Sequence, residues 1–253
     1  MAMTPMAQFS VKPLISEPIL TIAGHPIYFT NQALWMCVLV SVASIFLIMG
    51  GRKRALVPGR LQSMAEMSYE FVGNMIQSAA GKDGLRFFPF VFAIFFFVLF
   101  SNYFGLIPGV FTVTSQIAVT FGLAALVILV VVVTGFIVHG FRFLTLFVPK
   151  APLVLLILMV PIEVISFLTR PISLSVRLFA NMLAGHTMLQ VFAGFVIALA
   201  GAGGVLSALS LAPMLLIIAI MALEFLVAGL QAYVFAILTC IYLNEALHLH
   251  DHH

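Results

Sequence analysis

Long apolar runs, separated by short groups of polar and charged residues, dominate this chain. Residues 87–107 contain no charged side chain, and neither do residues 111–138. A helix that crosses a bilayer needs about 20 consecutive apolar residues. The pattern therefore predicts an all-α polytopic membrane protein.

We expect about five membrane-crossing helices. The first three span residues 33–49, 87–107 and 117–139. Two longer apolar stretches, 161–199 and 205–247, would each be roughly 60 Å long as continuous helices, about twice the hydrocarbon thickness. They are predicted to be tilted or curved and to pair as an antiparallel hairpin, joined by a glycine-rich link at 201–204. Prolines at 161, 171 and 213 are places where they can bend.

A different pattern occupies residues 58–80, after the first crossing. Apolar residues such as Leu61, Met64 and Phe71 recur there at helical spacing, whereas Glu66 and Glu70 occupy other faces. Opened by a proline, the segment is interpreted as an amphipathic helix on the membrane surface. A helix packed against neighbouring protein is the alternative.

Composition excludes a water-soluble fold. Hydrophobic residues make up 63% of the 253 positions and charged residues 8%, against roughly 25% charged in soluble domains. We interpret residues 1–253 as a single membrane domain, with 1–28 an external N-terminal segment without a signal-peptide pattern. The two cysteines are interpreted as core residues, and the histidine-rich end, 248–253, as a solvated terminus rather than a metal site.

Basic residues predict the orientation of the chain. They gather between the first and second crossings and after the third, whereas the opposite side has only Lys12. Because cytoplasmic loops carry the excess of Lys and Arg, the N-terminus is expected outside and the C-terminus inside. No internal sequence repeat of the kind found in duplicated secondary transporters is visible.

Ionisable residues inside the last two apolar stretches are the candidate functional residues. A charged side chain inside a span costs about 2.5–3.5 kcal/mol on insertion scales and by default indicates function. Glu163, Arg170 and Arg177 are spaced by seven and share one face of a helix. Further polar candidates in these stretches are Asn181, His186, Glu224 and Gln231.

An antiparallel pairing with Arg177 level with Gln231 aligns these residues. Glu163 would then lie level with Glu245, and His186 close to Glu224. The alternative is that the residues pair only to hold two helices together, although opposite charges would do so without an additional His, Asn and Gln.

Their chemistry separates the possible roles. Arginine keeps its proton in proteins, so Arg177 can only hold a fixed positive charge. Glu163, Glu224 and His186 can gain and lose protons. By helical rise, Glu163 lies ~21 Å to the inner side of Arg177 and His186 ~14 Å to the outer side. The arrangement indicates two proton paths that each stop halfway.

At these residues the sequence resembles a known family. Residues 170–186 read RPISLSVRLFANMLAGH, residues 224–235 read EFLVAGLQAYVF, and residues 101–108 read SNYFGLIP. All three resemble motifs of subunit a of F-type ATP synthases, and the resemblance covers residues 30–247. Some members carry a carboxylate at the position of His186 and a histidine at that of Glu224; this chain resembles the mitochondrial-type pattern.

The resemblance implies a proton-conducting stator subunit beside a rotating ring of c subunits. Protons would enter one half-channel, ride the ring and leave through the other, with Arg177 facing the ring between them. The outer path or its junction with the ring would include Asn102, Asn181, His186, Glu224 and Gln231; the inner path would include Glu163, Ser166 and Ser173. His186 favours protons over sodium, because neutral imidazole is a poor ligand for a hard alkali cation.

The resemblance also implies partners and location. We expect the c-subunit ring, the peripheral-stalk b subunits, the rest of the synthase and membrane lipid as partners, with no nucleic acid. The expected location is the bacterial inner membrane, with the mitochondrial inner membrane as the alternative. No phosphate-binding loop of the GxxxxGK[ST] kind occurs, so the subunit is expected to be non-catalytic, without cofactor or metal.

The sequence argues against two other functions. An ion-coupled secondary transporter should have broken, duplicated helices around a midplane site, which the sequence does not indicate. A membrane-embedded hydrolase should carry a GxSxG or HExxH motif, and the sequence contains neither.

Overall fold

The structure is a computed structural model that describes residues 10–14, 20–22, 25–52, 59–107, 110–147 and 153–248. Within these ranges, five helical segments are long and apolar enough to cross a membrane. They span Asn31–Arg52, Arg60–Gly105, Ile117–Leu144, Leu155–Gly201 and Ser207–Leu247. The chain is therefore an all-α polytopic membrane protein, as the apolar pattern predicted.

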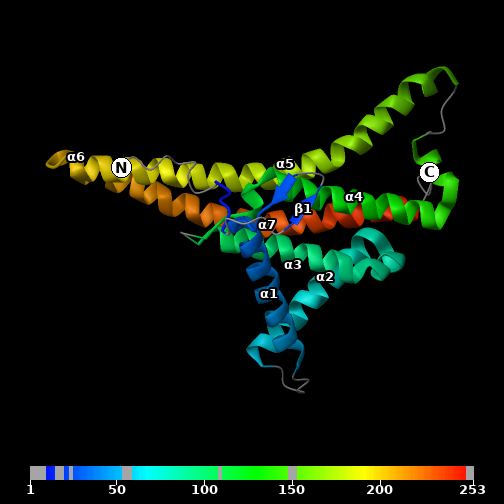
Figure 1. Ribbon diagram of the computed structural model, residues 1–253, viewed down its shortest axis with the longest axis horizontal. Coiled ribbons are helices and arrows are strands. Elements are labelled where there is room, and N and C mark those ends of the chain that lie inside the picture. The colour runs from blue at the N-terminus through cyan, green and yellow to red at the C-terminus, as the bar shows by residue number, and fades with distance from the viewer. Residues whose placement is uncertain are drawn as a thin grey trace. The chain divides into compact units, whose positions relative to one another are not determined.

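The three shorter crossings form helices close to their predicted ranges. They are α1 (Asn31–Arg52), α3 (Phe88–Gly105) and α4 (Ile117–His139), labelled in Figure 1. A short 3₁₀ helix, η3 (Val113–Ser115), lies between α3 and α4, and another, η4 (Gly140–Phe147), follows α4. Because α4 is apolar on all sides, its helical period carries no preferred face, and its length alone identified it.

The predicted amphipathic helix is α2 (Arg60–Gly84), followed by the 3₁₀ turn η2 (Leu85–Phe87). Gly81 interrupts α2 with a φ of 65° and a ψ of −164°. Such a backbone conformation is open to glycine and strained for other residues. The interruption comes one residue after the predicted end of the helix.

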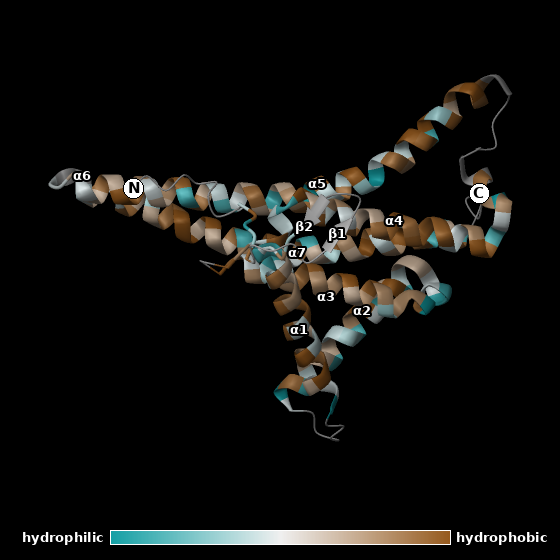
Figure 2. Cartoon of the chain, viewed as in Figure 1, coloured by the Kyte–Doolittle hydropathy of each residue, from teal (hydrophilic) through white to brown (hydrophobic). Residues whose placement is uncertain are grey.

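The two long stretches form α5 (Leu153–Gly201) and α7 (Leu211–Leu247). The second stretch is not one helix from 205, as predicted, because a turn at Ser210 separates the short α6 (Val205–Leu209) from α7. Gly203 and Gly204 both have positive φ and reverse the chain between α5 and α6. Figure 2 shows α5 and α7 mainly brown, with teal hydrophilic positions along their length.

The N-terminal segment contains two strands that the sequence reading did not predict. They are β1 (Leu20–Ile22) and β2 (His25–Ile27), which pair antiparallel with Thr21 opposite Pro26. An isolated bridge also joins Pro13 to Thr30. Several predicted features lie outside the described residues: parts of the 1–28 segment, the charged link at 53–58, Lys150 and the end of the tail at 249–253.

The chain divides into two compact units. The first unit comprises Met1–Ser44, Phe97–Gln116 and Leu178–Ala232. Most of its buried residues come from the end of α3, the link after it, and the parts of α5 and α7 that belong to this unit. They include Val98, Phe111, Val113, Leu178, Met182, Ala228 and Ala232.

The second unit comprises Ile45–Phe96, Ile117–Arg177 and Tyr233–His253. Here the second half of α2 is packed, with Val72 and Ile76 buried and the Phe71 ring 5.8 Å from that of Phe95. The first half leaves Leu61, Met64 and Met67 exposed. Packing on protein therefore holds for the second half, and contact with the membrane surface stays a prediction for the first.

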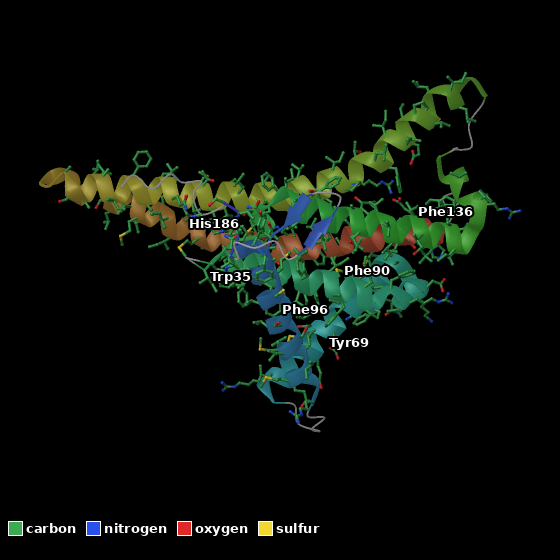
Figure 3. All side chains as sticks on the ribbon, in the orientation of Figure 1. Trp35, Tyr69, Phe90, Phe96, Phe136 and His186 are labelled. Carbon is green, nitrogen blue, oxygen red and sulfur yellow. The ribbon has the colours of Figure 1, made fainter. Side chains whose placement is uncertain are left out.

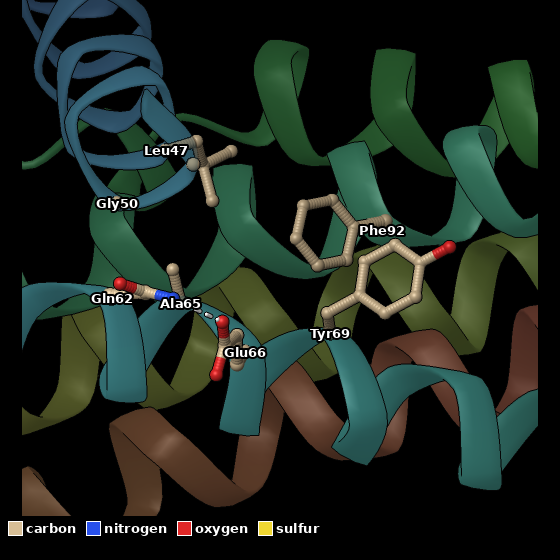
Figure 4. A pocket seen from close by; sticks show the side chains of 8 residues that line it. Leu47, Gly50, Gln62, Ala65, Glu66, Tyr69 and Phe92 are labelled. Atoms are coloured by element: carbon tan, nitrogen blue, oxygen red, sulfur yellow. Dashed lines mark hydrogen bonds between the residues drawn. The ribbon is translucent and has the colours of Figure 1, made fainter. Parts of the chain in front are cut away.

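A cavity of about 390 Å³ lies between the end of α1, the first half of α2, and α3 (Figure 4). Its lining includes one carboxylate, Glu66, which accepts a hydrogen bond of 2.8 Å from Gln62. Tyr69 and Phe92 form an aromatic wall, with ring centroids 6.1 Å apart. None of the candidate functional residues lines this cavity.

Candidate functional site

The structure brings His186 of α5 and Glu224 of α7 together. Figure 3 places His186 between the two helices, and its Nε2 lies 3.8 Å from Oε1 of Glu224. Glu224 is 6% exposed, and neither of its carboxylate oxygens has a hydrogen-bond partner among the described residues. A Cβ at Gly185 would lie 2.5 Å from Glu224 Oε1, so glycine at 185 allows the carboxyl group to reach α5. The predicted proximity of this pair is confirmed.

A second polar contact joins the same two helices. The Asn181 side-chain amide donates a hydrogen bond of 3.1 Å to Oε1 of Gln231. Gln231 is 4% exposed, and its Nε2 has no partner in the described part of the chain. The pairing predicted Arg177 level with Gln231. It is wrong by one helical turn here, because Gln231 bonds Asn181 and not Arg177.

Asn102 lies on α3, against α7. Its side-chain amide donates to the carbonyl oxygen of Ala228 at 3.2 Å, and the residue is 0% exposed. One residue further, the Tyr103 hydroxyl would be 2.8 Å from a Cβ at Gly229. Small residues on α7 therefore admit α3 closely and place Asn102 beside the polar stripe of α7.

A cavity of about 330 Å³ adjoins His186. This volume has room for several water molecules, because a water takes about 30 Å³ in the liquid. α5 contributes His186, Leu189, Gln190 and Ala193, α7 contributes Ile217 and Met221, and the end of α3 with the following link contributes Gly105, Leu106, Ile107 and Val110. His186 therefore borders a space that is large enough for water.

Sequence reasoning missed Gln190 in this cavity. Its Oε1 is buried and has no hydrogen-bond partner among the described residues. The available signal was spacing, since Gln190 follows His186 by one helical turn and continues the polar face of α5.

The link after α3 was also missed. Sequence reading described it only as uncharged, yet Thr112, Thr114 and Ser115 are buried. Thr112 Oγ1 lies 3.4 Å from His186 Nε2. No periodicity marks such a segment, because its burial depends on the helices around it.

The remaining candidates belong to the second unit and lie on one side of α5. Arg177, Ser173 and Ser166 are exposed, and their spacing of four and seven residues puts them on one face. Within the described residues, the Arg177 side chain makes no salt bridge or hydrogen bond. Glu163 is partly exposed. The exposed guanidinium of Arg177 can therefore meet a group outside this chain.

Arg170 pairs with Glu245 in the same unit, and its guanidinium lies 5.1 Å from the centroid of the Tyr242 ring. The prediction that Glu163 lies level with Glu245 is therefore wrong. Figure 1 shows the first turns of α5 running away from α7, and Pro161 and Pro171 lie within this helix. A bend removes Glu163 from α7 and leaves Arg170 as the partner.

Removing one member of the Arg170–Glu245 pair is expected to destabilise the protein. Glu245→Leu leaves a guanidinium partly buried among aromatic rings, at a cost of about 1–3 kcal/mol after allowance for its partial exposure. Arg170→Met together with Glu245→Leu should recover most of the loss, because no charge is then left unpaired. The check is the thermal midpoint of unfolding of the purified protein in detergent. A double variant less stable than Glu245→Leu would contradict the pairing.

Among the residues that the structure describes, no group of three or more His, Cys, Asp or Glu side chains could hold a metal ion. The histidine-rich end was interpreted as solvated; of it, only His248 is described, with its Nδ1 2.9 Å from Oδ1 of Asn244.

Comparison with known proteins identifies the family. The family model described as ATP synthase A chain matches residues 33–244. ATP synthase subunit a of Mesorhizobium japonicum is 59% identical over 245 residues, which cover 96% of both chains. The proteins of the same name from Rhizobium etli and Parvibaculum lavamentivorans are 54% identical over 253 residues and 55% over 245 residues, covering 100% and 93% of those relatives. This chain belongs to the ATP synthase subunit a family.

Proposed function

We propose that this chain is the proton-conducting stator subunit of a rotary F-type ATP synthase. The observation that carries the proposal is the buried pair His186–Glu224 beside a cavity of about 330 Å³. Two ionisable side chains enclosed in an apolar helical protein are costly, and such groups mark ion and proton pathways. Family membership supports the same function over a secondary transporter.

The outer path runs from the cavity to His186 and Glu224, and then along α7 to Gln231 and Asn181. The separation of 3.8 Å between His186 Nε2 and Glu224 Oε1 exceeds a hydrogen bond, so a water or a small side-chain rotation completes the transfer. Glu224 and Gln231 are seven residues apart, ~10 Å by helical rise, so water must bridge them in this path. Asn102 supports this path from α3.

The inner path uses Glu163, Ser166 and Ser173 on the exposed side of α5. Arg177 lies on that side too and meets the ring of c subunits, each of which brings a membrane carboxylate. Its permanent charge draws the carboxylate into the ionised form and repels a proton that would cross directly from one path to the other.

The wider assignment follows from this mechanism. The subunit is non-catalytic and works with the c ring, the peripheral-stalk b subunits and the ATPase head. It lies in the bacterial inner membrane with its N-terminus outside and its C-terminus in the cytoplasm. We interpret 1–253 as one membrane domain, with 1–28 external, the first half of 58–80 at the surface and 161–247 carrying the proton path.

Purification in mild detergent tests the proposal. A tag on this chain should bring down a small membrane protein that carries the ring carboxylate, together with the ATPase head. A secondary transporter would instead be purified alone, and that result, in the same detergent in which ATPase activity survives, would contradict the proposed function.

A further inference from the structure

Five consecutive residues of the link between α3 and α4 are buried, and three of them form the 3₁₀ helix η3 (Val113–Ser115). The five are Phe111 to Ser115, with Thr112 5% exposed and Thr114 1% exposed. Connecting segments almost always lie at the surface. Irregular backbone at membrane depth is tolerated where it is buried in protein or lines a water-filled cavity. Val110, which precedes the segment, lines the cavity beside His186.

Thr112 is the residue of this link that reaches His186. Its Oγ1 lies 3.4 Å from Nε2 of His186 and 3.5 Å from the carbonyl oxygen of Gly105. The Ser115 hydroxyl donates a bond of 2.6 Å to the Thr112 carbonyl and holds the turn in place. A Cβ at Gly105 would lie 2.8 Å from Thr112 Cγ2, so glycine at 105 permits this close approach.

The same nitrogen of His186 faces both Thr112 and Glu224. Nε2 is 3.4 Å from Thr112 Oγ1 and 3.8 Å from Glu224 Oε1. A threonine hydroxyl has one donor and two acceptor lone pairs, and its hydrogen rotates to suit. Thr112 can therefore accept from Nε2–H or donate to bare Nε2, with the Gly105 carbonyl taking its hydrogen in the first case.

We propose that Thr112 is a positioning residue, which keeps Nε2 of His186 directed at Glu224 in both protonation states. The proposal rests on the outer path proposed above. With His186 protonated, the single Nε2–H is shared between Thr112 and a bridging water, and the Thr112 hydrogen goes to Gly105. The Nε2–H bond then breaks, the proton passes through this water, and an O–H bond forms on the Glu224 carboxylate. Imidazolium and carboxylate become imidazole and carboxylic acid, and the Thr112 hydroxyl turns to donate to Nε2.

The Thr112 hydroxyl can exchange hydrogen bonds with the imidazole when the proton of His186 leaves. An imidazole that turns away from Glu224 breaks the relay, because proton transfer depends on the two groups being within reach directly or through one water. The hydroxyl thus acts on the rate through His186, without carrying the transferred proton itself.

Passive proton flux through vesicles of the assembled synthase, stripped of its head, tests the proposal. Thr112→Val keeps the shape and removes the hydroxyl, and should lower flux about 3- to 10-fold, the value of one modest hydrogen bond. Thr112→Ser restores a hydroxyl and should recover most of the flux. Thr114→Val is the matched control, since it removes a buried hydroxyl from the same link, one without a hydrogen-bond partner among the described residues; it should leave flux near the parent value.

A second background separates positioning from packing. In His186→Gln, adding Thr112→Val should lower flux no further, because the residue through which Thr112 acts is gone. Equal losses from Thr112→Val in both backgrounds, or no rescue by serine, would overturn the proposal. If valine prevents assembly, Thr112→Cys makes the same comparison with a weak hydrogen-bonding group.

The two proposals fail in different ways. If His186→Gln and Glu224→Gln leave proton flux unchanged, the outer path itself is wrong. If both lower the flux and Thr112→Val does not, the outer path stands and the role of Thr112 is refuted.

Discussion

Replacing Arg177 with alanine is expected to abolish ATP synthesis and ATP-driven proton pumping. In the proposed mechanism the fixed charge ionises the ring carboxylate and blocks direct passage of protons, so both functions should disappear with it. Passive flux through the membrane sector should survive or rise, because both paths remain. The measurement is proton flux in vesicles with and without the ATPase head, beside ATP synthesis under an imposed gradient.

Arg177→Lys is expected to fail as well. An ammonium group loses its proton far more readily than a guanidinium when it is desolvated, so lysine does not guarantee a permanent charge. Arg60→Ala is a suitable control, because Arg60 is exposed at the start of α2, far along the chain from the candidate residues. An alanine variant at 177 that assembles and still makes ATP at a substantial rate would contradict the assigned role.

The second large effect is expected from exchanging His186 and Glu224. Either single change, His186→Glu or Glu224→His, leaves two groups of the same type and should lower proton flux about 100-fold, as for loss of a general acid or base. The double exchange restores one carboxyl and one imidazole, and should conduct at least about tenfold better than the worse single variant. The side chains already face one another at 3.8 Å, so the exchange keeps the pair together.

Proton flux and assembly should be measured for all three variants and for Glu66→Gln as a control. Glu66 is a carboxylate of the separate cavity between α1, α2 and α3, and its replacement should leave flux unchanged. Losses in the double variant equal to the product of the single losses would show that His186 and Glu224 act independently.

The long helices could be read from the sequence because their signal is local. The uncharged run that became α4 and the glycine that interrupts α2 both lie within the elements that they define. The motifs around Arg177 and Gln231 are local as well, and they led to the family. Ionisable and polar residues inside otherwise apolar spans identified the candidate residues. The structure pairs His186 with Glu224 and Asn181 with Gln231.

Features that depend on how helices meet could not be read in this way. Helical spacing gives the face of each helix, but the register between two helices also depends on bends and crossing angle. Arg170 therefore took the partner predicted for Glu163. The burial of Thr112 has the same origin, since nothing in a short uncharged link reveals which side chains will surround it. The strands β1 and β2 were missed because three residues are too few for an alternating pattern.

Two aqueous paths that open on opposite sides of the membrane are the central claim, and thiol accessibility measures them directly. Cys240 is buried, but Cys37 is exposed, so the interpretation of Cys37 as a core residue is wrong. Both native cysteines would first be removed by Cys37→Ala and Cys240→Ala. Single cysteines would then be introduced by Gln190→Cys for the outer path and Ser166→Cys for the inner path, in synthase that retains proton transport.

A membrane-impermeant thiol reagent would then be applied to oriented vesicles from one side at a time. We expect the cysteine at 190 to react only from the outside and the cysteine at 166 only from the cytoplasmic side, each with loss of proton transport. Reaction of both cysteines from the same side, or of either from both sides while Arg177 is intact, would contradict two separate half-channels.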